Sequence, residues 1–121
     1  MFIGTAVAGA GNSVRRDGLV RARVWCEAAV ARDALRYQDT FRRGYFRGTF
    51  DRFANTYREP KESAIRAQMP RAQSCRATDG VKPGPRDDVY VPVEFTNGGT
   101  THTANLRMRR ESGFLVVVTI E

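Results

Sequence analysis

Residues 88–120 read DVYVPVEFTNGGTTHTANLRMRRESGFLVVVTI, and this stretch decides the fold. Apolar and polar residues alternate from Val89 to Thr96, as they do in a strand with one buried face. The run Asn97-Gly98-Gly99 predicts a hairpin, because both central residues of a type I′ turn need a positive φ. We therefore expect a second antiparallel strand whose apolar residues share the face of the first, whichever two of the three turn residues are central.

The second turn is Glu111-Ser112-Gly113, which suits a three-residue loop with glycine in the left-handed position. That loop pairs Met108 with Val116. A two-residue loop would set the large residues of the last strand beside Arg107 and Arg109, so the apolar pattern favours the longer loop. The residues that it brings to the face of Leu106 and Met108 are Phe114, Val116, Val118 and Ile120.

Three further features concern the rest of the sheet. Pro92 has no backbone N–H, so we expect the strand over 88–96 to lie at an edge or to contain a bulge. Residues 72–78 predict another strand, and residues 79–85 an exposed loop. Leu115 and Val117 fall on the mostly polar outer face, which indicates a subunit contact there.

The first half of the chain changes to helical spacing. Apolar residues recur at steps of three and four, which predicts a helix from about residue 17 to about residue 43. Its apolar stripe consists of Val20, Val24, Ala28, Ala31 and Leu35. A second, aromatic stripe at helical spacing consists of Phe46, Phe50, Phe53 and Tyr57, and we expect it to pack in the core. Pro60 can open a short third helix, which Pro70 ends.

These elements predict one α+β domain over residues 1–121, with N-terminal helices packed on one face of a curved C-terminal antiparallel sheet. Residues 17–69 form the helical half and residues 72–121 the sheet. Residues 1–16 are interpreted as a flexible lead or extra edge strand, or as the remnant of a trimmed signal or anchor. Their apolar run is far shorter than the ~20 residues of a membrane span, so no span is expected.

The formal net charge is +7, and eighteen of the twenty basic residues are arginine. Arginine binds phosphate and carboxylate in fork geometry, so the bias indicates an anionic partner. A GC-rich coding sequence would explain the preference for arginine but not the net charge. The candidate anion- or partner-binding residues are Arg42, Arg43, Arg47, Arg107, Arg109 and Arg110. The first three lie beside the aromatic segment, as in proteins that bind single-stranded nucleic acid, although arginine clusters are also typical of solvated faces.

Cys26 and Cys75 are the only cysteines. With a single histidine they cannot make a four-ligand zinc site, and we expect neither a metal nor a cofactor. Three alternatives stay open: two free buried thiols, a disulfide that pins helix to sheet in an exported protein, or a reactive thiol. The compartment is left open: a cytoplasmic protein is favoured, with an exported or envelope-associated one as the alternative.

His102 is the main candidate for chemistry. Strand parity directs it to the apolar face beside Val93 or Phe95, where a neutral imidazole can act as acid or base. Tyr37 and Asp39 would be its catalytic partners if the first helix lines the same cavity. The plainer alternative is a histidine at the rim of the sheet, bonded to water. The residues expected to line the cavity are Trp25, Phe50, Phe53, Phe95, Leu106 and Met108.

Helices followed by an antiparallel meander resemble the NTF2-like (cystatin-like α+β) superfamily. The resemblance rests on the long helix with Trp25 and Ala28, the segment 46–57, and the terminal VYVPVEF…ANLRMRRESGFLVVVTI. It implies a cone-shaped cavity, dimerisation through the sheet, and functions from small-molecule isomerases and cyclases to noncatalytic assembly domains of bacterial secretion and conjugation machines. Fold alone does not choose among these.

Scarce catalytic groups and a basic surface favour a noncatalytic binding or assembly domain. We expect it to engage an acidic protein or another anionic partner and to form a homo-oligomer, as a dimer through the sheet. The alternative is a small-ligand enzyme of isomerase, cyclase or hydrolase type that uses His102. Direct nucleic-acid binding is a third hypothesis.

Overall fold

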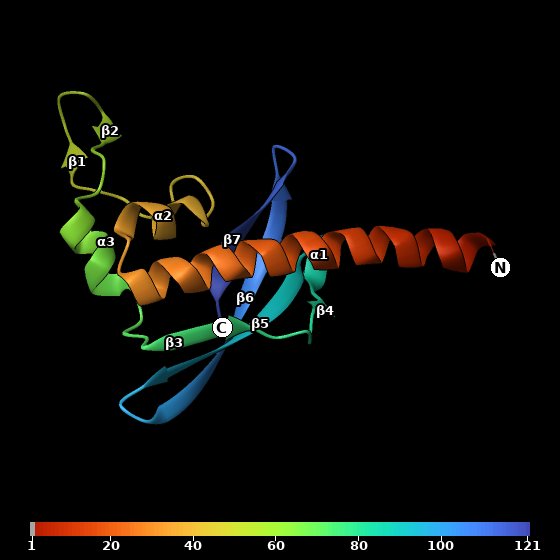
Figure 1. Ribbon diagram of the computed structural model, residues 1–121. Coiled ribbons are helices and arrows are strands. Elements are labelled where there is room, and N and C mark those ends of the chain that lie inside the picture. The colour runs from red at the N-terminus through yellow and green to blue at the C-terminus, as the bar shows by residue number, and fades with distance from the viewer. Residues whose placement is uncertain (1) are drawn as a thin grey trace.

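The protein has an α+β fold, described by a computed structural model for residues 2–121, with side chains from residue 13 onward. Helix α1 (Phe2–Ala31) lies across one face of a curved antiparallel sheet (Figure 1). The strands follow the order β3 (Ser74–Ala77), β5 (Val89–Asn97), β6 (Thr100–Glu111) and β7 (Phe114–Ile120), and β4 (Lys82–Pro83) also pairs with β5. The predicted fold class is confirmed.

The smaller elements lie between α1 and the sheet in the sequence. They are α2 (Ala34–Asp39), the two-stranded hairpin of β1 (Phe50–Asp51) and β2 (Thr56–Tyr57), α3 (Glu62–Gln68), and the 3-10 turn η1 (Pro85–Asp87). The short third helix and the strand within 72–78 are as predicted. Figure 1 places the β1–β2 hairpin at the end of the molecule away from the start of α1. Within residues 2–121, no helix is both long enough and apolar enough to cross a membrane.

Helix α1 begins and ends earlier than predicted. Its backbone is already helical at Phe2, where a flexible lead or an edge strand was expected. It ends at Ala31 because Arg32 takes a left-handed conformation (φ 56), and the Asp33 N–H then donates to the Ala28 carbonyl (3.0 Å). The Asp33 side chain accepts the N–H of Arg36 and so caps α2, which makes two helices of the predicted single one.

The face of α1 that packs on the sheet also differs from the predicted stripe. Ala28 of that stripe is buried as predicted, but Val20 is 52% exposed, and the buried face consists mostly of small residues. A side chain at Gly18 would bring its Cβ within 3.0 Å of Val91 Cγ2, so the helix axis runs too close to the sheet for larger residues there. Helical periodicity favoured the valines, but the close approach selects the small side chains. The buried residues of this face are Gly18, Ala22, Trp25, Cys26, Ala28 and Ala29.

Residues 46–57 form a loop and a hairpin instead of the predicted helix. The Asp51 carboxylate accepts the N–H groups of Phe53 (2.9 Å) and Ala54 (3.2 Å), and Asn55 is left-handed (φ 52). Carboxylates and asparagine commonly fix turns in this way, and here the turn competes successfully with the helix.

The aromatic stripe therefore does not exist as a core feature. Phe46 is buried, but Phe50, Phe53 and Tyr57 are exposed on the hairpin. The expectation that Phe50 and Phe53 line a cavity under the sheet is wrong, because the hairpin carries both away from α1.

The β5–β6 hairpin uses the second of the two turns that the sequence allowed. Gly98 and Gly99 are central, both with positive φ, and Asn97 pairs with Thr100. Val91 consequently pairs with Leu106, and both are fully buried. The predicted common apolar face is confirmed for these two strands.

The β6–β7 turn corrects the predicted register. Its central residues are Ser112 and Gly113, both with positive φ, so Glu111 pairs with Phe114. The three-residue loop is wrong, and a register shift follows farther along, between Arg107 and Met108.

This register reverses the faces expected for the last strand. Leu115 and Val117 are buried, so they are core residues and not an outer subunit contact, whereas Phe114 is 64% exposed. Val118 lies at the register shift and is buried, whereas Ile120 pairs with Leu106 beyond the shift and is exposed. Alternation could not decide the parity, because the run FLVVVTI is apolar at odd and even positions alike.

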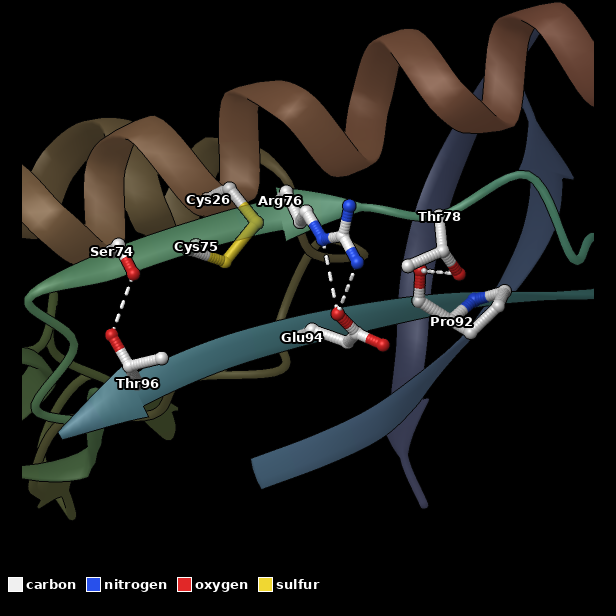
Figure 2. The surroundings of a disulfide bond; sticks show 8 residues. All are labelled: Cys26, Ser74, Cys75, Arg76, Thr78, Pro92, Glu94 and Thr96. Carbon is white, nitrogen blue, oxygen red and sulfur yellow. Dashed lines mark hydrogen bonds and ion pairs between the residues drawn. A yellow bond between two sulfur atoms is a disulfide. The ribbon is translucent and has the colours of Figure 1, made fainter. Parts of the chain in front are cut away.

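Strand β5 is an interior strand, although Pro92 had suggested an edge or a bulge. β3 pairs with the part of β5 that begins at Val93, and β4 pairs with the part that ends at Tyr90. Pro92 lies in the gap between the two partners, where its carbonyl accepts the N–H of Thr78 (2.9 Å) and the Thr78 hydroxyl (3.3 Å; Figure 2). A proline is therefore compatible with an interior strand here.

A disulfide joins Cys26 of α1 to Cys75 of β3, with the Cα atoms 5.1 Å apart (Figure 2). Of the three alternatives for these cysteines, the structure therefore has the disulfide that pins helix to sheet. Trp25, Leu106 and Met108 are fully buried between α1 and the sheet. These three predicted cavity-lining residues belong to the packed core.

Candidate anion-binding groove

The chain that leaves α2 is fixed against one edge of β7. The Val117 N–H donates to the Thr40 carbonyl (2.8 Å), and the Arg42 N–H donates to the Val117 carbonyl (2.9 Å). These two bonds form a parallel bridge that pairs Phe41 with Val117. The loop after α2 is thus attached to the sheet by its backbone.

Aromatic side chains anchor the same loop. Phe41 and Phe46 are buried on Tyr37, with ring centroids 5.0 and 6.1 Å from the Tyr37 ring. Such aromatic pairs add to the stability that burial provides. With Phe41 and Phe46 directed inward, the loop leaves Arg42, Arg43 and Arg47 exposed.

A groove of about 1030 Å³ opens between this loop, β2 and the β6–β7 turn. Two exposed aromatic side chains, Tyr57 and Phe114, form part of its lining. Arginines outnumber carboxylates in the lining, so the groove carries net positive charge. The positively charged residues are Arg21, Arg42, Arg43, Arg47 and Arg58, and the negatively charged ones are Asp39, Glu59 and Glu111. We call this surface the arginine groove.

Two of these arginines form exposed ion pairs. Arg42 lies 3.3 Å from Glu111, and Arg58 lies 3.5 Å from Asp51. Exposed pairs of this kind contribute little to stability, about 0–1 kcal/mol. An anionic ligand can therefore compete for both guanidinium groups at small cost to the fold.

The remaining exposed arginines of the loop are less constrained still. The Arg47 guanidinium carbon lies 5.1 Å from the centre of the Tyr57 ring, a cation–π contact that leaves its N–H groups open to a ligand. Its Nε also donates a long hydrogen bond to the Gly44 carbonyl (3.4 Å). Arg43 makes no side-chain hydrogen bond or ion pair with any residue from 13 to 121. Among the arginines that line the groove, it is therefore the one most available to a partner.

The second predicted arginine cluster lies elsewhere and is already paired. Arg107 Nε donates to Asp88 Oδ2 (2.6 Å), and Arg109 donates through Nε to Oδ1 (3.0 Å) and through Nη2 to Oδ2 (3.1 Å). Arg110 donates to the Gly113 carbonyl (3.0 Å) and lies 3.3 Å from Asp17 of α1. The structure does not bring these three to the arginine groove.

The Asp88 side chain is fully buried, and its ion pairs with Arg107 and Arg109 stabilise its charged form. Hydrogen bonding to Arg109 lowers the pKa of Asp88 most, burial opposes this effect, and Arg107 lowers the pKa further. In return, Asp88 raises the pKa of Arg109. Loss of an arginine partner would leave this buried charge uncompensated, which is strongly destabilising, so the cluster ties the segment before β5 to the outer face of β6.

The three residues predicted for acid–base chemistry are not assembled. Tyr37 is buried among aromatic rings, and this burial raises its pKa well above the usual range. Asp39 is exposed in the lining of the arginine groove. His102 shares a face with Phe95 as predicted, and their rings stack at 5.3 Å, but it lies exposed near the β5–β6 turn. Figure 1 places that turn and α2 on different sides of α1.

Among the lining residues that were not predicted from the sequence are two arginines and two aromatic residues. Arg58 and Tyr57 are adjacent in the chain, and reading 46–57 as a hairpin would have directed both to the surface. Phe114 was assigned to the inner face by the incorrect register. Arg21 lies on α1, where its Nε donates to the Leu115 carbonyl (3.0 Å), and no sequence signal distinguishes it from the other arginines of that helix.

In the part of the chain that the structure describes, no group of three or more histidine, cysteine or acidic side chains could hold a metal ion. Comparison with protein-family models, with curated proteins and with solved structures gives no match for this chain. The NTF2-like resemblance therefore stays a prediction, and inferences about function start from the arginine groove.

Proposed function

We propose that this protein is a noncatalytic binding or assembly domain that holds an acidic segment of a protein partner in the arginine groove. The observation that carries the proposal is the groove lining, in which five arginines face three carboxylates. Arginine forks bind carboxylates in pairs of hydrogen bonds, and Arg43 has no partner of its own among residues 13–121.

Two properties favour a protein over a nucleic acid as the partner. The groove carboxylates Asp39, Glu59 and Glu111 would repel a continuous phosphate backbone, whereas a peptide offers amide and basic groups beside its own carboxylates. The exposed rings of Tyr57 and Phe114 suit apolar side chains of such a peptide, since aromatic residues and arginine are enriched where proteins bind one another.

The disulfide supports an exported or envelope-associated protein. Such bonds persist in oxidising compartments and are rare in the cytosol of most organisms. On this basis we favour a location outside the cytoplasm, for the protein and its partner, over the cytoplasmic location first expected.

A fluorescein-labelled oligoglutamate peptide provides the direct test, with oligoglutamine as the uncharged control. We expect anisotropy to report binding of oligoglutamate at low salt and weaker binding as salt rises, because surface charges are screened. Arg42→Gln and Arg43→Gln should each weaken binding about twofold to fivefold. Arg23→Gln is the matched control, because Arg23 is an exposed arginine on α1 outside the groove lining.

The proposal is overturned if oligoglutamate fails to bind at low salt, or if Arg23→Gln weakens binding as much as Arg43→Gln. Tighter binding of oligothymidylate than of oligoglutamate, with the same arginine dependence, would assign the groove to nucleic acid instead.

The proposal includes self-association through the outer face of the sheet, where α1 does not pack. Thr103 and Asn105 are exposed on this face of β6. Light scattering at high concentration should give the mass of a dimer, and Thr103→Arg should shift it toward the monomer. A monomer mass for the unmodified protein at every concentration would refute this part alone.

A further inference from the structure

The β1–β2 hairpin exposes aromatic side chains together. Phe53 at its tip is fully exposed, and Phe50 and Tyr57 are about half-exposed. The hairpin projects from the rest of the molecule (Figure 1). Single exposed apolar residues are ordinary on a protein surface, but aromatic groups gathered on one projection mark an interaction site.

The exposure of Phe53 is built into the turn. The Asp51 carboxylate accepts the N–H groups of Phe53 (2.9 Å) and Ala54 (3.2 Å), which fixes the tip from inside. Behind the tip, the rings of Phe50 and Tyr57 pack edge to face, with centroids 5.2 Å apart. A partner that takes Phe53 therefore does not have to order the hairpin first, which lowers the entropic cost of binding.

The hairpin is also basic. Residues 47–58 contain Arg47, Arg52 and Arg58 and a single carboxylate, Asp51, in a chain whose net charge is +7. Asp51 already accepts two backbone N–H groups and lies 3.5 Å from Arg58. Arg52, next to Phe53 in the chain, is exposed. The projection thus presents an apolar tip with positive charge beside it.

We infer that this tip docks on the surface of an anionic phospholipid bilayer, with the Phe53 ring at the boundary between headgroups and acyl chains and Arg52 at the headgroups. Aromatic rings favour that boundary, and basic residues near an anionic leaflet are attracted to it. A bilayer accepts a protruding ring without a preformed pocket, whereas a protein partner must supply one. The projecting shape and the sign of the charge therefore fit a membrane surface.

The inference goes beyond the arginine groove and does not depend on it. Phe53 and Arg52 are not among the residues that line the groove. Vesicle binding and oligoglutamate binding can therefore fail separately, and each failure identifies the proposal that is wrong.

The test uses the intact, oxidised protein and sedimentation with two kinds of vesicle, one of phosphatidylcholine alone and one containing phosphatidylglycerol. We expect binding only when phosphatidylglycerol is present. Phe53→Ser should reduce the partition coefficient at least about tenfold, because most of the apolar area of the tip is lost. Arg52→Gln should reduce it about fivefold.

Two matched variants serve as controls. Leu35→Ser removes an exposed apolar side chain of α2 that is neither on the hairpin nor in the groove lining, and Arg23→Gln removes an exposed arginine on α1. Neither change should alter the partition coefficient by more than about twofold if the hairpin is the docking element. Thermal unfolding of Phe53→Ser should match that of the unmodified protein, because its side chain makes no buried contacts.

A second readout is fluorescence. In Phe53→Trp, emission should shift to the blue when phosphatidylglycerol vesicles are added, as the indole leaves water, while the buried Trp25 gives a constant background. Absence of vesicle binding, or binding that Phe53→Ser leaves unchanged, overturns the inference. If the protein does not bind vesicles but Phe53→Ser weakens the binding of oligoglutamate, the tip would instead be assigned to a protein partner.

Discussion

Breaking the cross-link between Cys26 and Cys75 should cost about 4 kcal/mol of unfolding free energy. The bond spans a sequence separation of 49, and the chain-entropy relation for a loop of that length gives this value at room temperature. The perturbation is the double substitution Cys26→Ala with Cys75→Ala, or reduction of the unmodified protein. Cys26 is buried, so alanine avoids placing a new polar group in the core.

The loss should be largest at β3. This strand has four residues and hydrogen-bonds only to β5, and the disulfide attaches it to α1. The side-chain pairs that join it to β5 are exposed: Arg76 with Glu94 at 2.7 Å, and Ser74 with Thr96 at 2.5 Å (Figure 2). Because exposed pairs contribute little, β3 depends on the cross-link more than the other strands do.

Urea unfolding measures the loss in the free energy of unfolding of the whole protein, and hydrogen exchange measures the loss of protection at β3. We expect amides of residues 74–77 to lose protection well before those of β6 in the double variant. Each single substitution should cost nearly as much as the double one, because the bond is broken once in either case. Mass spectrometry after alkylation, with and without a reductant, verifies the oxidised starting state. A loss below about 1 kcal/mol with unchanged exchange in β3 would refute the reasoning.

Three further predictions concern single residues. Gly18→Val should cost about 1–3 kcal/mol, measured by urea unfolding, because the side chain forces α1 off the sheet; an unfolding midpoint equal to that of the unmodified protein would contradict the close approach. The pKa of Asp88 is lowered in the folded state, so its contribution to stability is present above the unfolded pKa of about 3.9 and is lost as pH falls through the folded pKa. Asp88→Asn should therefore be less stable than the unmodified protein at neutral pH. In unfolding curves measured over a series of pH values, the variant should also lack the loss of stability that protonation of Asp88 causes in acid. Gly48→Ala should displace the hairpin, since the new Cβ would clash with the Arg58 carbonyl and lie 2.7 Å from that of Glu59, and shifted NMR resonances for residues 50–57 with unchanged sheet resonances would verify it.

The sequence predicted the α+β class and the β5–β6 hairpin because those features depend on local chemistry. The two glycines of the turn and the alternation after Val89 leave few other structures. The β6–β7 register was missed for an equally local reason, since an apolar residue at every position from 114 to 118 removes the parity signal. The two-residue turn put Leu115 and Val117 in the core, and the register shift that follows falls at Val118, which is buried as well.

The helical half was predicted less well because tertiary contacts decide it. The spacing of Val20 and Leu35 is helical, but close approach to Val91 selects small residues on another face. Three of the six candidate arginines, Arg42, Arg43 and Arg47, line the arginine groove together because the loop that carries them is attached to β7. The partner that occupies Arg107 and Arg109 is Asp88, about twenty residues away in the chain, and such pairing is not visible in the sequence.

The disulfide also divides the chain into two parts with different freedom to change. Residues 27–74 lie between the two bonded cysteines, one on α1 and one on β3. They include the end of α1, α2, the loop of Arg42 and Arg43, the β1–β2 hairpin and α3. Lengthening a loop inside such a closed segment costs little, because closure entropy grows only with the logarithm of length. Relatives of this protein would therefore be able to vary the length and chemistry of the hairpin widely while the helix-on-sheet scaffold outside the bond stays the same.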